Sequence, residues 1–515
     1  MTPGAVSSKL APFPRVGPPR ERRAPAPVLW RFRRIPSPAE TAAPGPGAPS
    51  SSELAALALV VGLGALLRLV APGVFPEVLP DEGLWTNSTK NGLLFGDPFM
   101  DGRTHLLLSP LFHLACWPLF ALFGPSIAAA RVVSGLAGAA AVPLTYLLVL
   151  RLTGRRAPAL AAALLFATDQ SFVWAGRLAQ VEAFQLVWLL GAAVALARPS
   201  RPGAALGGAL FALALLAKTN SVFLLPVLGL WLAWPDDPRA GWLDRRALGR
   251  AVLFGAVAVG LAGLVYGALY RAEPERFVSA FQFELREEFD PSDAVVSASR
   301  FGLDPTKSAR SIQALLSESP FLYVLASIGM AVAAFAGGRG PGLLVAWAAF
   351  GTAFVLLQVY QPGRYFHLNA PALAGCAALA VGALLPSAPH GARVRGAVLA
   401  LVVAFNLGSL GMNAATNPAR MLAETTAWAR ESLPAEARVI AAGYLCTDLP
   451  QRAYAWYHLA RTPEELLAAV DAYDVDYVLY DHEEWPPDWL PALDAAFTRV
   501  AEWPFGVAYR VRPAP

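Results

Sequence analysis

Charged residues are scarce in this chain of 515 residues: they make up 15% of it, against 56% hydrophobic residues. Apolar runs of membrane-spanning length recur along most of the chain, so the composition predicts a polytopic helical membrane protein. Cysteine is scarce too. Cys116, Cys376 and Cys446 lie far apart without a C-x-x-C pair, which argues against a disulfide framework and against a cysteine metal site. The chain also lacks a P-loop motif, which argues against nucleotide-powered transport.

The net charge of +4 is small, and its distribution is more informative than its sum. Residues 1–52 hold seven Arg and one Lys against only Glu21 and Glu40, and they are rich in Pro and Ala. This composition predicts a disordered basic arm that stays in the cytoplasm. The first membrane helix, about 53–71, therefore starts inside and ends outside. We expect no nucleic-acid partner.

The apolar stretch 106–124 decides the topology of everything that follows. If it crossed the bilayer, the next helix would deliver Arg151, Arg155 and Arg156 to the outside, against the positive-inside rule. We therefore predict that Ser109-Pro110 and Trp117-Pro118 mark a broken segment that lies along the membrane surface. The first external loop then covers residues 72–126, and we expect position 90 within it to be accessible from outside.

With that choice, the sequence predicts an all-α membrane domain over residues 53–412 with eleven spans. The spans lie near 53–71, 127–150, 157–173, 183–197, 204–217, 220–234, 250–270, 319–336, 342–360, 364–385 and 394–411. A second external loop, 271–318, carries apolar residues every four positions from Phe277 to Phe289, as in an amphipathic surface helix. A solvated connector with one packed face fits equally well.

The composition becomes that of a soluble domain in residues 413–515, which we predict to be a small extracytoplasmic α/β domain. The patterns predict helices at 419–432, 463–473 and 489–497, and strands at 438–443, 475–480 and 507–511. The run from His482 to Glu484 lacks H-E-x-x-H spacing and is interpreted as solvated rather than as a metal site.

Four polar features converge on the predicted outer face. They are the Asp81-Glu82 loop, the stretch 176–182 with Arg177 and Glu182, Lys218 at the end of its helix, and the stretch 363–367 with Arg364, Tyr365 and His367. Each feature taken alone also fits a purely structural role: the acids could cap helices, the lysine could snorkel, and the Arg-Tyr pair could anchor the chain at the membrane interface. Together they fit transfer of a sugar from a polyprenyl phosphate, which needs a carboxylate as general base and fixed positive charge for the departing phosphate.

The order and spacing of several short motifs resemble those of a known family. The motifs are Pro80-Asp81-Glu82-Gly83, Phe123-Gly124, Ala130-Arg131, Gly154-Arg155-Arg156, Gly176-Arg177 through Glu182, Ala217-Lys218 and Arg364-Tyr365. The family is that of polyprenyl-phosphate-dependent glycosyltransferases of the GT-C fold, in the bacterial group related to protein O-mannosyltransferases and the lipid A aminoarabinose transferase (glycosyltransferase family 39 type).

The resemblance implies roles for six of the polar residues on the outer face. Asp81 is expected to be the catalytic carboxylate with Glu82 beside it, and Glu182, the third member of the expected catalytic set, stands where the family usually has Asp. Lys218 and Arg364 are expected to bind the donor phosphate, and Tyr365 to line the same cavity. No cofactor is assigned, and a divalent cation is left open.

The same resemblance implies the partners and the location. They are a polyprenyl-phosphate sugar donor, an extracytoplasmic acceptor (a protein, a lipid or a cell-envelope glycan) and membrane lipids. A bacterial inner membrane is expected, with the N-terminus in the cytoplasm and the C-terminus outside. A lipid or sugar transporter without transferase activity is the main alternative, and a non-catalytic polysaccharide-binding protein is the second.

Overall fold

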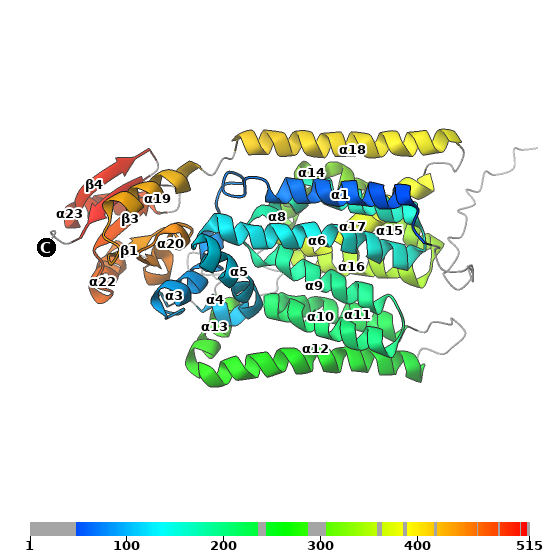
Figure 1. The fold of residues 1–515 in the computed structure, drawn as a ribbon, viewed down its shortest axis with the longest axis horizontal. Coiled ribbons are helices and arrows are strands. Elements are labelled where there is room, and N and C mark those ends of the chain that lie inside the picture. The colour runs from blue at the N-terminus through cyan, green and yellow to red at the C-terminus, as the bar shows by residue number, and fades with distance from the viewer. Residues whose placement is uncertain are drawn as a thin grey trace, which may run out of the picture. The chain divides into compact units, whose positions relative to one another are not determined.

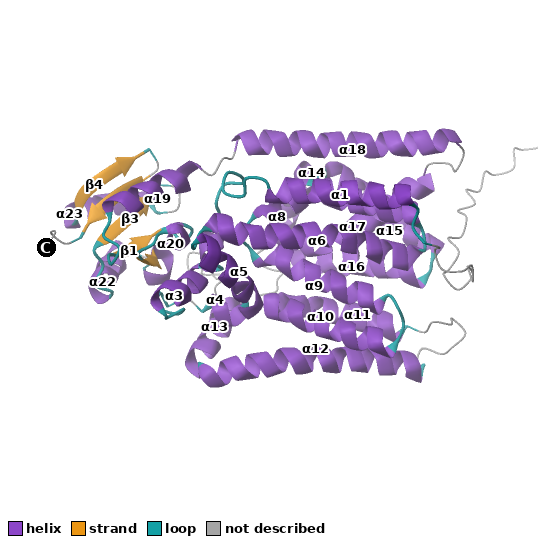
Figure 2. Cartoon of the chain, viewed as in Figure 1, coloured by secondary structure: helices purple, strands orange, loops and turns teal. Residues whose placement is uncertain are grey.

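The computed structural model is mainly helical, with a small sheet confined to its C-terminal part (Figures 1 and 2). It describes residues 48–102, 104–234, 244–286, 305–357, 363–384, 389–416, 420–460, 462–482, 485–504 and 506–511. The fold class predicted from the sequence, a helical membrane protein with a small α/β part, is confirmed.

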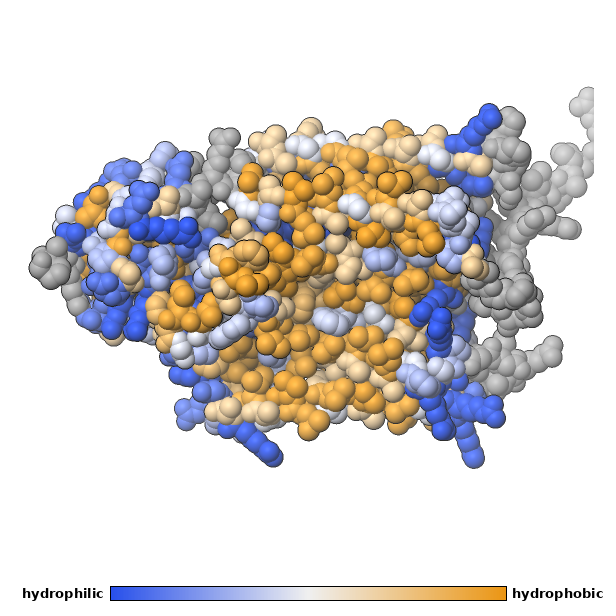
Figure 3. Space-filling model, in the orientation of Figure 1, coloured by the Kyte–Doolittle hydropathy of each residue, from blue (hydrophilic) through white to orange (hydrophobic). Residues whose placement is uncertain are grey.

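Twelve helices form the membrane part of the described chain. They are α1 (Ser51–Leu69), α6 (Ile127–Thr153), α7 (Arg156–Thr168), α8 (Gln170–Arg177), α9 (Val181–Leu196), α10 (Arg201–Ala217), α11 (Leu224–Ala233), α12 (Arg245–Ala272), α15 (Pro320–Ala336), α16 (Arg339–Leu356), α17 (Ala370–Leu384) and α18 (Pro389–Thr416). In Figure 3, hydrophobic residues cover the flanks of these helices, while hydrophilic residues gather toward the helix ends and over the α/β part.

Each predicted span coincides with a helix, but the helices differ in how well they qualify as spans. Six are long and apolar enough to cross a membrane, and two more qualify as bent pairs, α7 with α8 and α15 with the preceding α14 (Pro305–Glu318). Helices α9, α10 and α11 are shorter than 18 residues, below the usual spanning length of about 20. The count of eleven therefore stays a prediction, as does the sidedness.

The segment predicted to be the first external loop folds into four short helices. They are α2 (Pro80–Leu84), α3 (Asn87–Phe95), α4 (His105–Leu108) and α5 (Pro110–Phe123). The predicted break at Ser109-Pro110 is confirmed, because α4 ends at Leu108 and α5 restarts with a proline in its first turn. The predicted break at Trp117-Pro118 is wrong, because α5 continues through Pro118 to Phe123. The Ser109 hydroxyl at the confirmed break donates to the Ala217 carbonyl at 2.5 Å, which fastens the loop to the end of α10.

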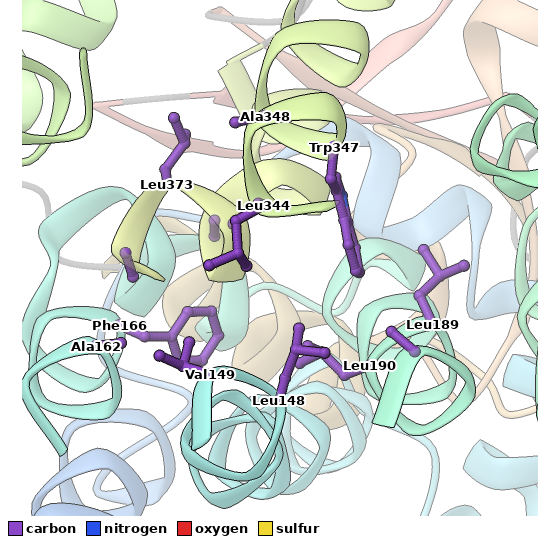
Figure 4. Packing of buried hydrophobic residues seen from close by; sticks show 14 of the residues in the cluster. Leu148, Val149, Ala162, Phe166, Leu189, Leu190, Leu344, Trp347, Ala348 and Leu373 are labelled. Atoms are coloured by element: carbon purple, nitrogen blue, oxygen red, sulfur yellow. The ribbon is translucent and has the colours of Figure 1, made fainter. Parts of the chain in front are cut away.

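The core of the membrane part consists of small and branched apolar side chains packed between α6, α7, α9, α16 and α17. Figure 4 shows Trp347 and Leu344 of α16 above Leu148 and Val149 of α6. The outer helices α1, α12 and α18 bury few of their side chains, as expected for helices that face lipid.

A buried arginine, Arg68, stabilises the break between α7 and α8. Arg68 of α1 is fully buried and donates to the carbonyls of Phe166 and Ala167 at 3.1 and 2.9 Å, at the point where α7 gives way to α8 with a 58° bend. A Cβ on Gly138 would lie 2.8 Å from the Arg68 side chain, so this glycine leaves the room that the guanidinium needs.

The second external loop contains helix α13 (Pro274–Arg286) as well as α14. The Phe277 and Phe281 rings pack against each other with centroids 4.7 Å apart, and both contact Tyr266 of α12. The predicted apolar face thus packs on the neighbouring helix over its first half. Phe289, at the end of the predicted repeat, lies outside the described residues.

The C-terminal part is a five-stranded mixed sheet with order β2-β1-β3-β5-β4. Its elements are α19 (Arg420–Ser432), β1 (Arg438–Ala441), α20 (Leu445–Asp448), β2 (Arg452–Ala455), α21 (Trp456–Leu459), α22 (Pro463–Ala472), β3 (Tyr477–Asp481), α23 (Leu490–Ala496), β4 (Thr498–Trp503) and β5 (Gly506–Arg510). Strand β1 is parallel to β2 and β3, whereas β5 is antiparallel to β3 and β4.

The three helices and three strands predicted here are confirmed within a few residues. Strands β2 and β4 were not predicted, because β2 is only four residues long and β4 is largely exposed without clean alternation. The boundaries of the three predicted domains stay predictions. Glu483 and Glu484, part of the run interpreted as solvated, lie outside the described residues.

Candidate active site

Helix α2 places Asp81 and Glu82 in its first turn. Pro80 occupies the first helical position, which needs no N–H, and the Glu82 Oε1 accepts a hydrogen bond from the Leu79 N–H at 2.9 Å. Adjacent residues on a helix point in different directions, and the two acids therefore meet different surroundings. Asp81 is half-buried, whereas the Glu82 side chain is fully buried.

Glu82 forms a two-pronged ion pair with Arg131 of α6. Arg131 Nε donates to Oε2 and Nη2 donates to Oε1, both at 2.7 Å, and the backbone N–H of Ala179 donates to Oε2 at 2.6 Å. With the Leu79 N–H, each carboxylate oxygen accepts two hydrogen bonds. This geometry favours a positioning role for Glu82; the catalytic role expected from the resemblance stays a prediction.

Arg131 also fixes the chain that leads into α2. Its guanidinium donates to the carbonyls of Pro72, Pro76 and Glu77 at 2.8 to 3.1 Å. A single arginine on a membrane helix thereby holds both the approach to α2 and its third residue, Glu82. Such a buried arginine is costly unless its donors are used in this way.

Glu182 and Lys218 form a second buried ion pair, with Lys218 Nζ 2.8 Å from Glu182 Oε1. Glu182 lies in the first turn of α9 and Lys218 caps the C-terminal end of α10. Both charges suit the helix end that carries them, because a helix N-terminus favours anions and a C-terminus favours cations. The pair is almost fully buried, with side chains 1% and 4% exposed.

Two aromatic rings flank the Lys218 ammonium. Its nitrogen lies 5.2 Å from the Trp85 ring centre and 4.7 Å from the Tyr365 ring centre, both within the range of cation–π attraction. Trp85 follows Asp81 by one helical turn, and its N–H donates to the Asp81 carbonyl at 3.2 Å. Positions four apart lie on the same face of a helix, so α2 turns its Asp81 face toward the Lys218 region.

The structure thus joins most of the residues expected at the site. Lys218 contacts both Glu182 and Tyr365, and Trp85 connects it to the helix of Asp81. Arg364 is the second residue of a short helical turn, Gly363–Asn369, but its side chain lies outside the described residues. Its expected phosphate-binding role stays a prediction.

Known proteins resemble this chain in sequence and in fold. Residues 108–264 match the family model described as dolichyl-phosphate-mannose-protein mannosyltransferase. The structure is also similar to that of apo ArnT from Cupriavidus metallidurans, with a TM-score of 0.64 and 14% identity over 90% of this chain and 99% of that chain. The chain has the GT-C glycosyltransferase fold.

Two further structures share the GT-C fold with this chain. ArnT from the same organism bound to undecaprenyl phosphate gives a TM-score of 0.62, again at 14% identity over 90% of this chain and 99% of that chain. The apo oligosaccharyltransferase of Archaeoglobus fulgidus gives 0.55 at 14% identity, over 87% and 73%. No curated protein sequence matches the chain. The predicted class of enzyme, a membrane glycosyltransferase, is confirmed.

Three residues important to this GT-C site received no role from the sequence: Trp85, Arg131 and Arg177. The Arg177 guanidinium donates to the carbonyls of Leu67 and Phe75, among others, and thereby secures the end of α1 rather than facing Lys218. The sequence carried a signal for the two arginines, because an arginine placed in or beside an apolar helix requires partners. Trp85 had no signal of its own, because its role depends on a lysine 133 positions further along the chain.

A metal ion was left open by the sequence, and the described residues give it no ligand set. No group of three or more His, Cys, Asp or Glu side chains lies together within the part of the chain that the structure describes. The carboxylates of Glu82 and Glu182 are engaged with cations instead. No step of the chemistry below is therefore routed through a metal, and the divalent cation stays untested.

Proposed function

We propose that this protein transfers a sugar from a polyprenyl-phosphate donor to a hydroxyl group of an extracytoplasmic acceptor, with inversion at the anomeric carbon. The observation that carries the proposal is the buried Lys218, held by Glu182 between Trp85 and Tyr365 at one end of the helices. A fixed cation, and a half-buried acid, Asp81, on the helix that Trp85 caps, are the two groups that this reaction needs.

Asp81 is the general base in this proposal. Its carboxylate removes the proton of the acceptor hydroxyl as that oxygen attacks the anomeric carbon, and its half-buried position leaves it within reach of an acceptor. Glu82 acts indirectly, because its four hydrogen bonds fix the turn of α2 on which Asp81 lies.

Lys218 binds the leaving group. As the bond between the anomeric carbon and the phosphate oxygen breaks, that oxygen keeps the electron pair and the polyprenyl phosphate gains negative charge. A positive charge fixed in place before the reaction stabilises this charge without further reorganisation. Glu182 orients the ammonium, and the Trp85 and Tyr365 rings confine it. Arg364 would add a second cation.

Proteins of the same fold support the choice of donor. ArnT from Cupriavidus metallidurans has been solved bound to undecaprenyl phosphate, and AglB from Archaeoglobus fulgidus in complex with an inhibitory peptide and a dolichol-phosphate. A lipid phosphate is thus a ligand of other GT-C proteins. We place the donor headgroup of this chain beside Lys218, with its isoprenoid tail in the bilayer.

The test replaces the proposed base. Asp81→Asn keeps the size of the side chain but removes the proton acceptor, so transfer of labelled sugar from prenyl-phosphate donors to membrane extracts should fall by about 10² to 10⁴-fold. Donor binding should stay close to that of the wild type. Asp97→Asn, an exposed acid in the same external loop, is the matched control and should keep full activity.

Any of three results would overturn the proposal. Full activity of Asp81→Asn would exclude Asp81 as the general base, and a product with retained anomeric configuration would exclude a single displacement. A wild-type protein that moves the lipid across vesicle membranes but forms no glycoside would instead identify a transporter.

A further inference from the structure

We infer that residues 443–453 of the C-terminal part are a positioning element for the loop that carries Asp81. The inference rests on the proposed function for the role of Asp81, and it gives the α/β part a task in the reaction. It comes from a set of contacts between residues 83–90 and a segment more than 350 positions further along the chain.

The first contact is a close approach of two backbones. A Cβ on Gly83 would lie 1.7 Å from the Gly443 carbonyl oxygen, so only glycine permits α2 to lie against this segment. Three residues further along, the hydroxyl groups of Thr86 and Thr447 are 2.7 Å apart, and both side chains are fully buried. The loop and the segment therefore pack without a layer of solvent between them.

The second contact involves a buried charge. Lys90 Nζ donates to the carbonyls of Cys446 and Gln451 at 2.6 and 2.9 Å. The expectation that position 90 is accessible from outside is wrong, because the Lys90 side chain is fully buried. Removing an ammonium group from water is costly unless its donors are satisfied, so Lys90 ties α3 to α20 and to the chain that follows it.

The same segment is anchored to the membrane part on its other side. Asp448 Oδ2 accepts a hydrogen bond at 3.0 Å from the N–H of Ile127, the first residue of α6. Helix α6 also carries Arg131, which binds Glu82. Residues 443–453, α6 and the Asp81 loop therefore form a closed ring of contacts, in which each member limits the movement of the other two.

This ring determines how precisely Asp81 is placed. Glu82 holds the start of α2 from the membrane side, while Gly83, Thr86 and Lys90 are held from the α/β side. A general base acts only within hydrogen-bond reach of the proton it removes, and a misplacement of about 1 Å can cost about 10²-fold in rate. Loosening the α/β side should therefore reduce turnover and leave the Lys218 region able to bind donor.

The first experiment is Lys90→Met in the full-length protein, which keeps the length of the side chain but removes its donors. We expect kcat to fall by about 10- to 100-fold, in keeping with a displaced base, while the KM for the donor changes less than twofold. Amide hydrogen exchange of residues 83–91 should become faster. Lys307→Met, on helix α14, is the matched control and should change neither quantity.

The second experiment restores the contact covalently. The Thr86 and Thr447 oxygen atoms are 2.7 Å apart, close enough for a disulfide of about 2.05 Å after Thr86→Cys and Thr447→Cys. In the Lys90→Met background, the oxidised pair should recover most of the lost kcat, and reduction should remove that gain. Each single cysteine variant is the control for effects of the substitutions themselves.

The possible failures are distinguishable. If Lys90→Met keeps its kcat, or if the cross-link forms without recovery of kcat, the positioning role is wrong. If kcat and donor affinity fall together, Lys90 acts on general stability instead. If the wild type transfers no sugar, the proposed function is wrong, and unchanged exchange of residues 83–91 in Lys90→Met would separately refute the structural part of the inference.

Discussion

Replacement of Arg131 by Met tests the ion pair that holds the Asp81 loop from the membrane side. The change keeps most of the side-chain volume but removes both hydrogen bonds to Glu82 and those to the carbonyls of Pro72, Pro76 and Glu77. It also leaves a fully buried carboxylate without its cation. Breaking a buried pair in this way costs about 3–5 kcal/mol, which is a large part of the stability of a typical domain.

The double variant Arg131→Met with Glu82→Gln separates the ion pair from simple loss of packing. The second change removes the unpaired charge. The double variant should therefore lose less free energy of unfolding than the two single variants lose together, by about 1–3 kcal/mol. The surface pair of Arg276 with Glu273, with side chains 47% and 39% exposed, provides the control. Arg276→Met should cost less than about 1 kcal/mol.

Reversible unfolding in detergent micelles, followed by circular dichroism, measures these free energies. The reasoning would be refuted if Arg131→Met were as stable as Arg276→Met, or if the losses of Arg131→Met and Glu82→Gln were simply additive. Either result would mean that the two charges do not depend on each other, despite their 2.7 Å contact.

Three further predictions concern other charged positions. Lys218→Met should weaken donor binding at least about tenfold, and adding Glu182→Gln should restore folding but not donor affinity; donor affinity equal to the wild type would contradict the phosphate role. Burial raises the pKa of Asp448 to about 6 from its ordinary value of 3.8, so this group favours the folded state below about pH 4 and loses that contribution as the pH rises past 6. Asp448→Asn should therefore remove on the order of 3 kcal/mol of pH dependence between pH 4 and 7, and an unchanged profile of unfolding against pH would refute it. Cysteine replacing the exposed Asp97 should be labelled from outside intact cells, whereas cysteine replacing the exposed Arg155 should be labelled only after permeabilisation; the opposite pattern would invert the topology.

Sequence patterns predicted the elements of this fold well where the signal was local. Hydrophobic length located the membrane helices, and the placement of arginines decided that 106–124 does not cross the membrane as one helix. The break at Ser109 then follows from a proline that starts a new helix at Pro110. These signals lie within one segment and depend on composition and charge, both of which are visible in a single sequence.

The sequence indicated which residues belong to the site better than it indicated which of them contact one another. Lys218 and Glu182 were both expected, but their ion pair joins residues 36 positions apart and had no signal in the sequence; the catalytic role that the resemblance implies for Glu182 stays a prediction. Glu82 and Lys90 show the same limit: each looks like a loop residue, and each is buried by partners from distant segments. Local sequence does not encode which distant carbonyl or cation completes a buried group.

Arg68 has a consequence for the order in which this protein is made. Helix α1 enters the membrane first, yet the carbonyls that its arginine binds belong to Phe166 and Ala167, 98 and 99 residues later in synthesis. Arg68 lies in the last turn of α1, so until those residues emerge from the ribosome its guanidinium is best solvated by snorkelling toward the membrane surface. Completion of the bend between α7 and α8 is therefore the event that gives Arg68 its partners outside α1 and lets its charge become buried in protein.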